Sequence, residues 1–408
     1  MEEDVSSQKV KISSHLRCVA QTPSDSVTAN NGAVSNYFKS AQWTADGTTV
    51  ISNSADNHIR SYILPTDLLD EYPHNIKPYH TIPSKEPIYS IAAYPYYNLQ
   101  DTSTTLVLSG VRDHPVRLNS TLFPGLLASY SLVSPTTEAF ITPHALIYPS
   151  ALGGTHFITG SDSLICLFDV SRPGKDGPIS RHPTIPSKRK KIVGGGVGIK
   201  GIVSALALET SGSGMLAAGT FTRYVGLYGD NGSGDTIATF SIAGTEAERV
   251  IGGGGVTRVI WSPCGRYLYV AERKSDGVLV YDIRVTGQLL GWLEGRKART
   301  NQRLDVDLVD GSLTGDSSAE LWAGGTDGSV RVWKSLGQTE GGTRPAWDQH
   351  LHGDPVTSAV VHPMGSVLAT SSGQKQYPSF PEQDQDAHDE IKSGDGVQID
   401  NTLRIWEL

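Results

Sequence analysis

The sequence predicts an all-β fold, a seven-bladed β-propeller whose ring is closed by an N-terminal strand. Its 408 residues include 44 Gly and 22 Pro, and so many turn residues disfavour long helices. A pattern of short apolar runs separated by turns recurs seven times, and a repeat of roughly 40 to 60 residues is typical of propeller blades. No sequence remains after Leu408 to complete the last repeat, so the closing strand must come from the N-terminus.

The clearest copy of the repeat is LWAGGTDGSVRVW, residues 321–333. Two apolar runs, 321–323 and 330–333, flank four Gly and Asp turn residues, which is the signature of a β-hairpin. This hairpin resembles the second half of a WD repeat, which often holds a hydrogen-bonded set of His, Ser, Asp and Trp. Asp327 and Trp333 would supply two members, but no His stands in the expected loop before them. We therefore expect the blades to depend mainly on packing.

The other copies follow at regular spacing. The seven repeats span residues 38–64, 88–122, 145–170, 202–228, 256–283, 302–333 and 356–406. Each supplies three strands, and candidates for the fourth are 79–82, 127–132, 236–242, 289–293 and 347–350, whereas the strand after the third copy is poorly marked. Residues 15–21 are expected to complete the last blade, because a closed ring leaves only short, protected edges.

One domain is therefore expected over residues 14–408, after a flexible N-terminus of residues 1–13. Two insertions interrupt it: residues 172–200, rich in Pro, Gly and basic residues, and residues 374–398, which are polar and acidic. A different all-β fold is the alternative, but seven correctly spaced copies are difficult to obtain from another architecture.

Composition and motifs narrow the function. The chain has no run of eighteen apolar residues and no apolar N-terminal segment, so we expect neither a membrane span nor a secretory signal. Cys18, Cys166 and Cys264 are far apart, which argues against a disulfide framework and a zinc site. The glycine clusters do not give GxxxxGK followed by Ser or Thr, and HExxH and GxSxG are absent. We expect a monomeric non-enzyme with no metal, cofactor or small-molecule substrate.

Local charge is more informative than the net charge of -8, which gives no general reason to expect nucleic-acid binding. In a propeller, the connections from fourth to first strand and from second to third strand share one face. The RNA-binding candidates on that face are Arg112, Lys200, Arg223, Arg273, Lys274, Arg296, Lys297, Arg299 and Arg303. The densest stretch is GRKARTNQR, residues 295–303, and Arg can fork onto a phosphate or stack on an unpaired base. Solvated surface charge is the alternative.

A second basic cluster, Lys188, Arg189, Lys190 and Lys191, resembles a nuclear-localisation signal on an exposed loop. The alternative is a solvated basic run without a targeting role. The first interpretation predicts a nuclear protein and leaves a cytoplasmic pool open.

Several details outside the repeat pattern resemble the telomerase Cajal body protein family and its splicing-associated relatives. They are NSADNHIRSYILP (53–65), RPGKDG (172–177), GLYGDNGSG (226–234), TNQR (300–303) and HPMGSVLATSSGQ (362–374). The resemblance implies a non-catalytic scaffold that binds small nuclear, small Cajal-body and telomerase-type RNA, or their ribonucleoproteins, and aids their nuclear assembly or localisation. The alternative is a protein-only WD-repeat adaptor, similar to splicing-complex or G-protein β scaffolds, without direct RNA contact.

Overall fold

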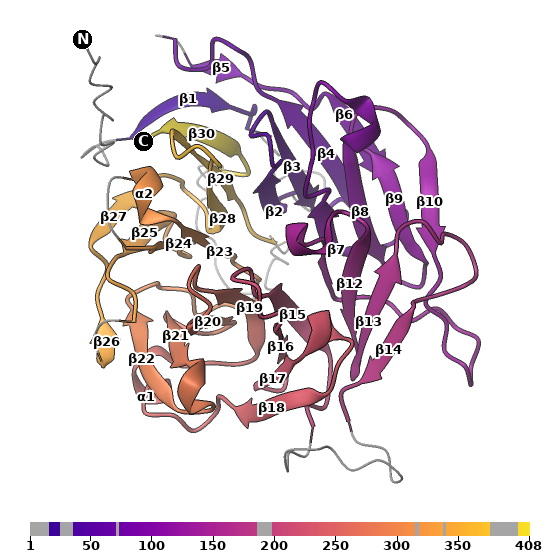
Figure 1. Ribbon diagram of the computed structural model, residues 1–408. Coiled ribbons are helices and arrows are strands. Elements are labelled where there is room, and N and C mark those ends of the chain that lie inside the picture. Colours follow the sequence, from indigo (N-terminus) through magenta and orange to yellow (C-terminus); the bar gives the residue numbers. More distant parts are fainter. Residues whose placement is uncertain are drawn as a thin grey trace, which may run out of the picture.

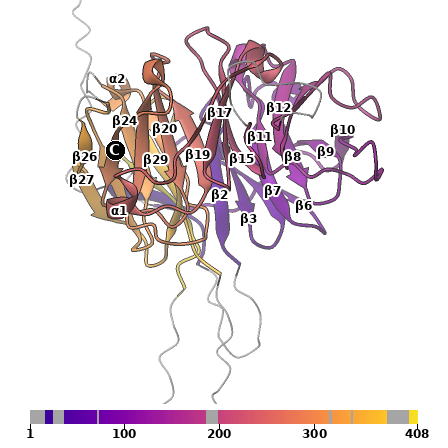
Figure 2. The same cartoon turned by 90° about the horizontal axis from the view of Figure 1, so that it is seen from below.

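Strands dominate the computed structural model, which describes residues 16–24, 36–70, 73–185, 198–314, 318–337, 340–375 and 399–408. Within these ranges the strands form seven sheets arranged as blades around a central axis (Figure 1). Seen after a 90° turn, the strands run roughly along that axis (Figure 2). The predicted seven-bladed propeller is therefore confirmed.

Blades 1 to 4 each contain four antiparallel strands, and the first strand lies nearest the axis. Blade 1 consists of β2 (Phe38–Trp43), β3 (Thr49–Ser54), β4 (His58–Ile63) and β6 (His80–Pro83). Blade 2 consists of β7 (Ile88–Ala93), β8 (Leu106–Val111), β9 (Val116–Ser120) and β10 (Leu126–Tyr130). Blade 3 consists of β11 (Ala145–Ile147), β12 (His156–Ser161), β13 (Leu164–Asp169) and β14 (Ser180–Pro183). Blade 4 consists of β15 (Val203–Leu208), β16 (Leu216–Thr220), β17 (Tyr224–Tyr228) and β18 (Thr236–Ser241).

Blades 5 and 7 each carry a fifth, outermost strand that pairs in parallel. Blade 5 consists of β19 (Val256–Trp261), β20 (Tyr267–Glu272), β21 (Gly277–Asp282), β22 (Leu289–Glu294) and β26 (Gly341–Thr343). Blade 6 consists of β23 (Val306–Val309), β24 (Glu320–Gly324), β25 (Ser329–Trp333) and β27 (Trp347–His350). Blade 7 consists of β28 (Val356–Val361), β29 (Val367–Ser372), β30 (Leu403–Glu407), β1 (Arg17–Gln21) and β5 (His74–Asn75). The helices are short: α1 (Glu248–Ile251), α2 (Gly311–Thr314), η2 (Thr102–Thr104), η3 (Ser150–Leu152), η4 (Asp230–Gly232) and η5 (Ile283–Val285).

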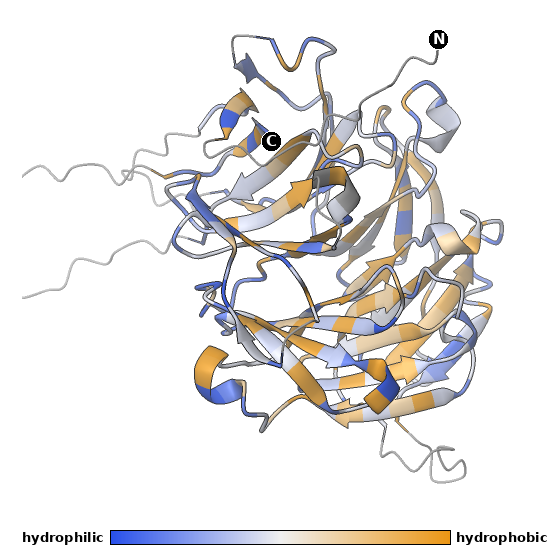
Figure 3. Ribbon diagram, turned by 60° about the vertical axis from the view of Figure 1, so that its left-hand side comes forward, coloured by the Kyte–Doolittle hydropathy of each residue, from blue (hydrophilic) through white to orange (hydrophobic). Residues whose placement is uncertain are grey.

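The hydrophobic core lies between neighbouring blades. Apolar residues follow the strands, and hydrophilic residues gather at the connections (Figure 3). Trp322 of blade 6 shares one buried cluster with Val361 of blade 7, and Ile158 of blade 3 shares another with Tyr228 of blade 4. Because each sheet can bury its faces only against the next sheet, the ring depends on every blade being present.

Glycines near the ends of second strands set how closely blades approach. A Cβ on Gly219 would come within 2.4 Å of the Val256 side chain, and one on Gly324 within 2.4 Å of the Val356 carbonyl oxygen. Both valines begin the first strand of the next blade. The glycines are therefore required for close packing between sheets rather than for an unusual backbone conformation.

The N-terminal strand closes the ring, as predicted. β1 pairs antiparallel with β30, with Arg17 opposite Glu407 and Gln21 opposite Arg404. The two strands lie side by side although they come from opposite ends of the chain (Figure 1). Val19 and Ala20 of β1 are fully buried.

Some boundaries differ from the prediction. The poorly marked fourth strand of blade 3 is β14, which lies inside the stretch 172–200 predicted as an insertion. β23 begins at Val306, four residues after the predicted start. The predicted flexible residues 1–13, the cluster Lys188–Lys191 and residues 376–398 lie outside the part of the chain that the structure describes. Within that part, no helix has the length and apolar character needed to cross a membrane.

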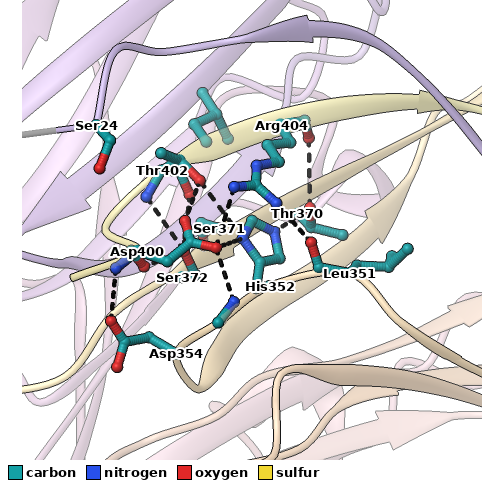
Figure 4. A network of polar contacts seen from close by, with 12 residues as sticks. Ser24, Leu351, His352, Asp354, Thr370, Ser371, Ser372, Asp400, Thr402 and Arg404 are labelled. Carbon is teal, nitrogen blue, oxygen red and sulfur yellow. Dashed lines mark hydrogen bonds and ion pairs between the residues drawn. The ribbon is translucent and has the colours of Figure 1, made fainter. Parts of the chain in front are cut away.

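Blade 7 contains a complete hydrogen-bonded WD set that the sequence did not reveal, and Figure 4 shows its members His352, Thr370 and Asp400. Trp406 Nε1 donates to Thr370 Oγ1 at 2.8 Å, Thr370 Oγ1 lies 2.7 Å from His352 Nε2, and His352 Nδ1 lies 3.3 Å from Asp400 Oδ2. A neutral imidazole with its proton on Nδ1 satisfies this order of donors and acceptors. Asp400 follows the long insertion, which hides its relation to the other members in the sequence.

Asp354 fixes both ends of that insertion. One carboxylate oxygen accepts from Gln374 Nε2 at 3.0 Å, and the other accepts from the Asp400 backbone N–H at 2.7 Å. The loop therefore leaves the blade and returns to it at one defined point.

Candidate functional site

All nine predicted basic residues lie on one face of the ring. This top face consists of the connections from fourth to first strand and from second to third strand in each blade. The strand order therefore supports the placement of these residues, but their side chains differ in burial and in ion pairing.

Arg296 requires a correction, because it was expected to be available to RNA. Its side chain is only 1% exposed, and its Nη2 donates to the Leu304 carbonyl oxygen at 2.6 Å. Burial lowers the pKa of Arg296 to about 10, so the guanidinium remains charged at neutral pH. Arg296 anchors the connection between blades 5 and 6 from the inside and is removed from the set of RNA contacts.

Five candidates are paired with carboxylates. Arg112 lies 2.6 Å from Glu86, Lys297 lies 3.0 Å from Asp327, and Arg303 lies 3.1 Å from Asp305. Arg299 forms an ion pair with Asp276, and Arg223 lies 2.6 Å from Glu248 and 2.7 Å from Glu272. A carboxylate neighbour weakens the positive field that a phosphate would meet. The positive charge of residues 295–303, the densest basic stretch in the sequence, is therefore largely neutralised by neighbouring carboxylates.

Three candidates have no ion pair with any described residue: Lys200, Arg273 and Lys274. Arg273 stacks on an aromatic ring, and a backbone contact and chain position keep Lys200 and Lys274 near it. The Arg273 guanidinium lies 3.8 Å from the centre of the Phe221 ring, Thr222 Oγ1 donates to the Lys200 carbonyl oxygen, and Lys274 follows Arg273 in the same hairpin. We call Lys200, Phe221, Arg273 and Lys274 the blade 4–5 patch.

Arg273 is the most unusual member of the blade 4–5 patch. Burial lowers the pKa of its guanidinium, and its Nε is buried without a hydrogen-bond partner among the described residues. Stacking of a guanidinium on an aromatic ring fixes its plane and leaves N–H donors directed away from the ring. This arrangement suits an anionic ligand, because a half-buried cation without a counter-charge gains from a negative partner.

A cavity of about 660 Å³ opens at the centre of the ring beside this patch, and Phe221 lines it. On the other side Tyr89 stacks on His144, with ring centres 4.7 Å apart, and Tyr89 is 39% exposed. Arg258 also lines the cavity, and its Nε has no partner within the described ranges. The cavity thus combines aromatic faces with cationic donors.

Phe221, Tyr89 and Arg258 were not among the site residues predicted from the sequence. Phe221 stands in the turn of the hairpin LAAGTFTRYV, where an aromatic residue is unusual because hairpin turns favour Gly, Asn and Asp. The aromatic residue in this turn could therefore have marked the site in the sequence. Tyr89 and Arg258 lie within first strands, so only the closed ring reveals that they line a cavity. In the described part of the chain, no three His, Cys, Asp or Glu side chains are grouped to hold a metal ion.

Comparison with known proteins gives relatives over most of the chain, although no protein-family model matches it. Guanine nucleotide-binding protein negative regulator 1 of Schizosaccharomyces pombe is 32% identical over 305 residues, which covers 74% of this chain and 71% of that protein. Telomerase Cajal body protein 1 of Homo sapiens is 28% identical over 383 residues, covering 91% of this chain and 64% of the human protein.

The Drosophila melanogaster homolog of telomerase Cajal body protein 1 is 25% identical over 382 residues, or 90% of this chain and 60% of that protein. The chain therefore spans slightly less than two thirds of the human protein and of the fly homolog. The residues of this chain that align with the human and fly proteins include most of the ring. The chain belongs to the family of WD-repeat propeller proteins that includes guanine nucleotide-binding protein negative regulator 1 and telomerase Cajal body protein 1.

Proposed function

We propose that this protein is a non-catalytic scaffold that binds small nuclear, Cajal-body-type or telomerase-type RNA, or ribonucleoproteins that contain such RNA. In this role it aids the assembly or localisation of these particles in the nucleus. The names of the human and fly relatives support the ribonucleoprotein context. RNA, ribonucleoprotein proteins and a nuclear location, with the cluster Lys188–Lys191 as its signal, belong to this proposal.

The observation that carries the proposal is the blade 4–5 patch. A phosphate backbone is attracted by cations that are not already neutralised, and Lys200, Arg273 and Lys274 form no ion pair with a described residue. Phe221 and Tyr89 offer aromatic faces on either side of the central cavity, and unpaired bases stack on such rings.

Single-stranded or looped RNA fits this surface better than a regular duplex. Among the nine candidates, those without an ion pair to a described residue lie in one part of the top face, whereas carboxylates accompany Arg112, Lys297 and Arg299. A duplex would require a long basic track. An unpaired loop can place a phosphate at Arg273 and a base against an aromatic ring at the cavity mouth.

The test compares two variants that lose the same charge. In the first, Lys200, Arg273 and Lys274 are replaced by Ala; in the control, Arg112, Lys297 and Arg299 are replaced by Ala. Binding of a fluorescent hairpin RNA with a single-stranded loop is measured between low and physiological salt. We expect the first variant to bind more weakly, with a salt slope smaller by about 2 units, and the control to keep most of its affinity.

Equal losses in the two variants would reject the blade 4–5 patch as the contact and favour a diffuse basic face. Unchanged binding in both variants would reject the RNA interface on the top face.

The second candidate function is a protein-only adaptor that regulates a signalling protein. The S. pombe relative supports it, because that protein is named as a negative regulator of a guanine nucleotide-binding protein and is 32% identical. Retained RNA binding in the Lys200, Arg273 and Lys274 variant, together with loss of a co-purifying protein partner, would favour this alternative.

A further inference from the structure

Exposed apolar side chains concentrate on blade 2. Among the described residues, fifteen large hydrophobic side chains are exposed, and six of them lie between residues 88 and 144: Tyr89, Tyr96, Phe123, Leu126, Leu127 and Phe140. Phe123, Leu126 and Leu127 are 50%, 56% and 58% exposed. Tyr89 lines the central cavity, and Tyr96 and Phe140 lie in other connections. Phe123, Leu126 and Leu127 are close together in sequence at the outer strand of the blade, and such a cluster of exposed apolar side chains is a candidate interaction surface.

Leu126 and Leu127 lie on β10, the outermost strand of blade 2. The sequence from Thr121 to Tyr130, TLFPGLLASY, contains no charged residue. Edge strands usually carry a charge or another feature that prevents pairing with a further strand. β10 lacks a charge, and the register of its pairing with β9 shifts between Leu126 and Ala128, which places Leu127 at a bulge. The exposed apolar side chains at this point, and not a regular edge, make β10 a candidate for strand addition.

In blades 5 and 7, a short parallel strand covers the fourth strand of the blade. β26 adds to β22 through three residue pairs, Gly291 to Leu293 with Gly341 to Thr343, and β5 adds to β1 through two pairs. Each added strand belongs to the connection between the third and fourth strands of the next blade. The ring therefore accepts short parallel strands at its outer rim.

On β10 this covering is incomplete. The corresponding connection of blade 3 reaches it only at Gly174, which bridges Tyr130. Gly174 N donates to the Ser129 carbonyl oxygen at 2.7 Å and its own oxygen accepts from Ser131 N at 3.2 Å. Among the described strands, none pairs with the outer edge from Leu126 to Ala128. That length equals the three pairs that β26 makes.

We propose that this edge is a protein-docking site, at which an extended apolar segment of a partner protein adds as a further strand beside β10. The site is continuous with the interface that Gly174 already forms. Backbone hydrogen bonds would supply the pairing, and Phe123, Leu126 and Leu127 would contact alternate apolar side chains of the partner. The stretch 121–130 offers no cation to a phosphate, so the site is chemically distinct from the blade 4–5 patch and does not depend on the proposed RNA binding.

The test uses a fluorescent peptide of eight residues in which Val and Thr alternate, and a second peptide with Pro at two central positions. Pro removes N–H donors and cannot continue a ladder. Fluorescence polarisation measures binding to the full chain, and hydrogen exchange locates the protected amides. We expect protection of residues 126–128 and at least tenfold weaker binding of the Pro peptide.

Two variants provide the matched comparison. Leu127→Lys places a charge on the open edge, and Val285→Lys places one in η5, away from any strand edge, at a residue that is 54% exposed. We expect Leu127→Lys to weaken peptide binding at least tenfold and Val285→Lys to leave it unchanged. Near-ultraviolet circular dichroism checks that both variants keep the native fold.

Equal binding by the Leu127→Lys variant, or protection at a strand other than β10, would overturn the proposal. So would a dimer of the chain that Leu127→Lys dissociates, because the occupant would then be a second copy. The Lys200, Arg273 and Lys274 variant separates the two proposals, since it should lose RNA affinity and keep peptide affinity.

Discussion

Arg296 illustrates why a basic residue in a loop is not always a ligand contact. It lies in the connection with the highest density of positive charge in the chain, yet its guanidinium points inward to the Leu304 carbonyl oxygen. Its own carbonyl oxygen accepts from Arg331 Nη1 at 3.2 Å. The side chain therefore holds the connection from the inside, and the backbone of Arg296 ties that connection to blade 6.

The first prediction concerns this residue. Arg296→Ala should lower the free energy of unfolding by about 2 to 4 kcal/mol, because it leaves a cavity and unpaired polar groups. Urea unfolding followed by tryptophan fluorescence measures it. Lys297→Ala is the control: its side chain is 63% exposed, and we expect a change within about 0.5 kcal/mol. Similar stability of the two variants would contradict the inward role of Arg296.

At the scale of single elements, three of the hairpins between second and third strands share an Asp–Arg pair. The pairs are Asp56 with Arg60, Asp327 with Arg331 and Asp400 with Arg404. In each pair the turn carboxylate reaches a guanidinium four residues later on the third strand. This spacing was visible in the sequence and explains how Asp327 is satisfied without a His partner.

The second prediction concerns the network of blade 7 and its pH dependence. Burial lowers the pKa of His352 below its ordinary value of 6.5. For Asp400, burial alone would raise the pKa, but hydrogen bonds from His352, Thr402 and Gly353 hold it well below its usual range. Both shifts mean that the unfolded chain binds more protons than the folded chain. Stability should therefore fall as the pH drops below about 6.5.

His352→Gln isolates this contribution. At pH 7 the variant should be less stable by about 1 to 3 kcal/mol, because Asp400 loses a buried donor. Between pH 7 and pH 5 its stability should change less than that of the wild type, since the titrating imidazole is absent. Urea midpoints at several pH values measure both effects. Parallel pH profiles for the two proteins would show that His352 is not the titrating group.

At the scale of the whole molecule, the ring depends on strands from its two ends. The Arg17 guanidinium lies 2.8 Å from Glu407, and Thr22 N donates to the Leu403 carbonyl oxygen at 2.9 Å. Without β1, the edge of β30 and the buried cluster around Ile405 would face solvent. Closure of the ring therefore requires both β1 from the N-terminal region and β30 from the C-terminal region of the chain.

The third prediction follows from this closure. Removal of residues 1–21 should lower the melting temperature markedly and promote association, because an apolar strand edge becomes available. Removal of residues 1–13 keeps β1 and is the control, for which little change is expected if that segment is flexible as predicted. Differential scanning calorimetry and light scattering measure the two outcomes. A melting temperature unaffected by removal of residues 1–21 would contradict closure by β1.

Much of the ring could be predicted because local patterns repeat. Alternating apolar residues and Gly or Asp turns fix strands and hairpins, and seven copies leave one compatible architecture. β14 was missed because SRHP is short and polar, and β5 and β26 were missed because their two or three residues gain stability only from the strand beside them. The assignment of residues 14–408 to one domain, with a flexible segment before it, stays a prediction.

The sequence by itself determined the repeat, the direction of every connection and hence the face on which the basic residues lie. Only the tertiary structure decided which charges remain free. Arg223 forms an ion pair with Glu272 of the next blade, and the Arg273 guanidinium stacks on Phe221 of the previous blade. Electrostatic compensation depends on distance in space, and a closed ring brings together residues that no sequence window contains. For the same reason the open edge of β10 became visible only once its neighbours were placed.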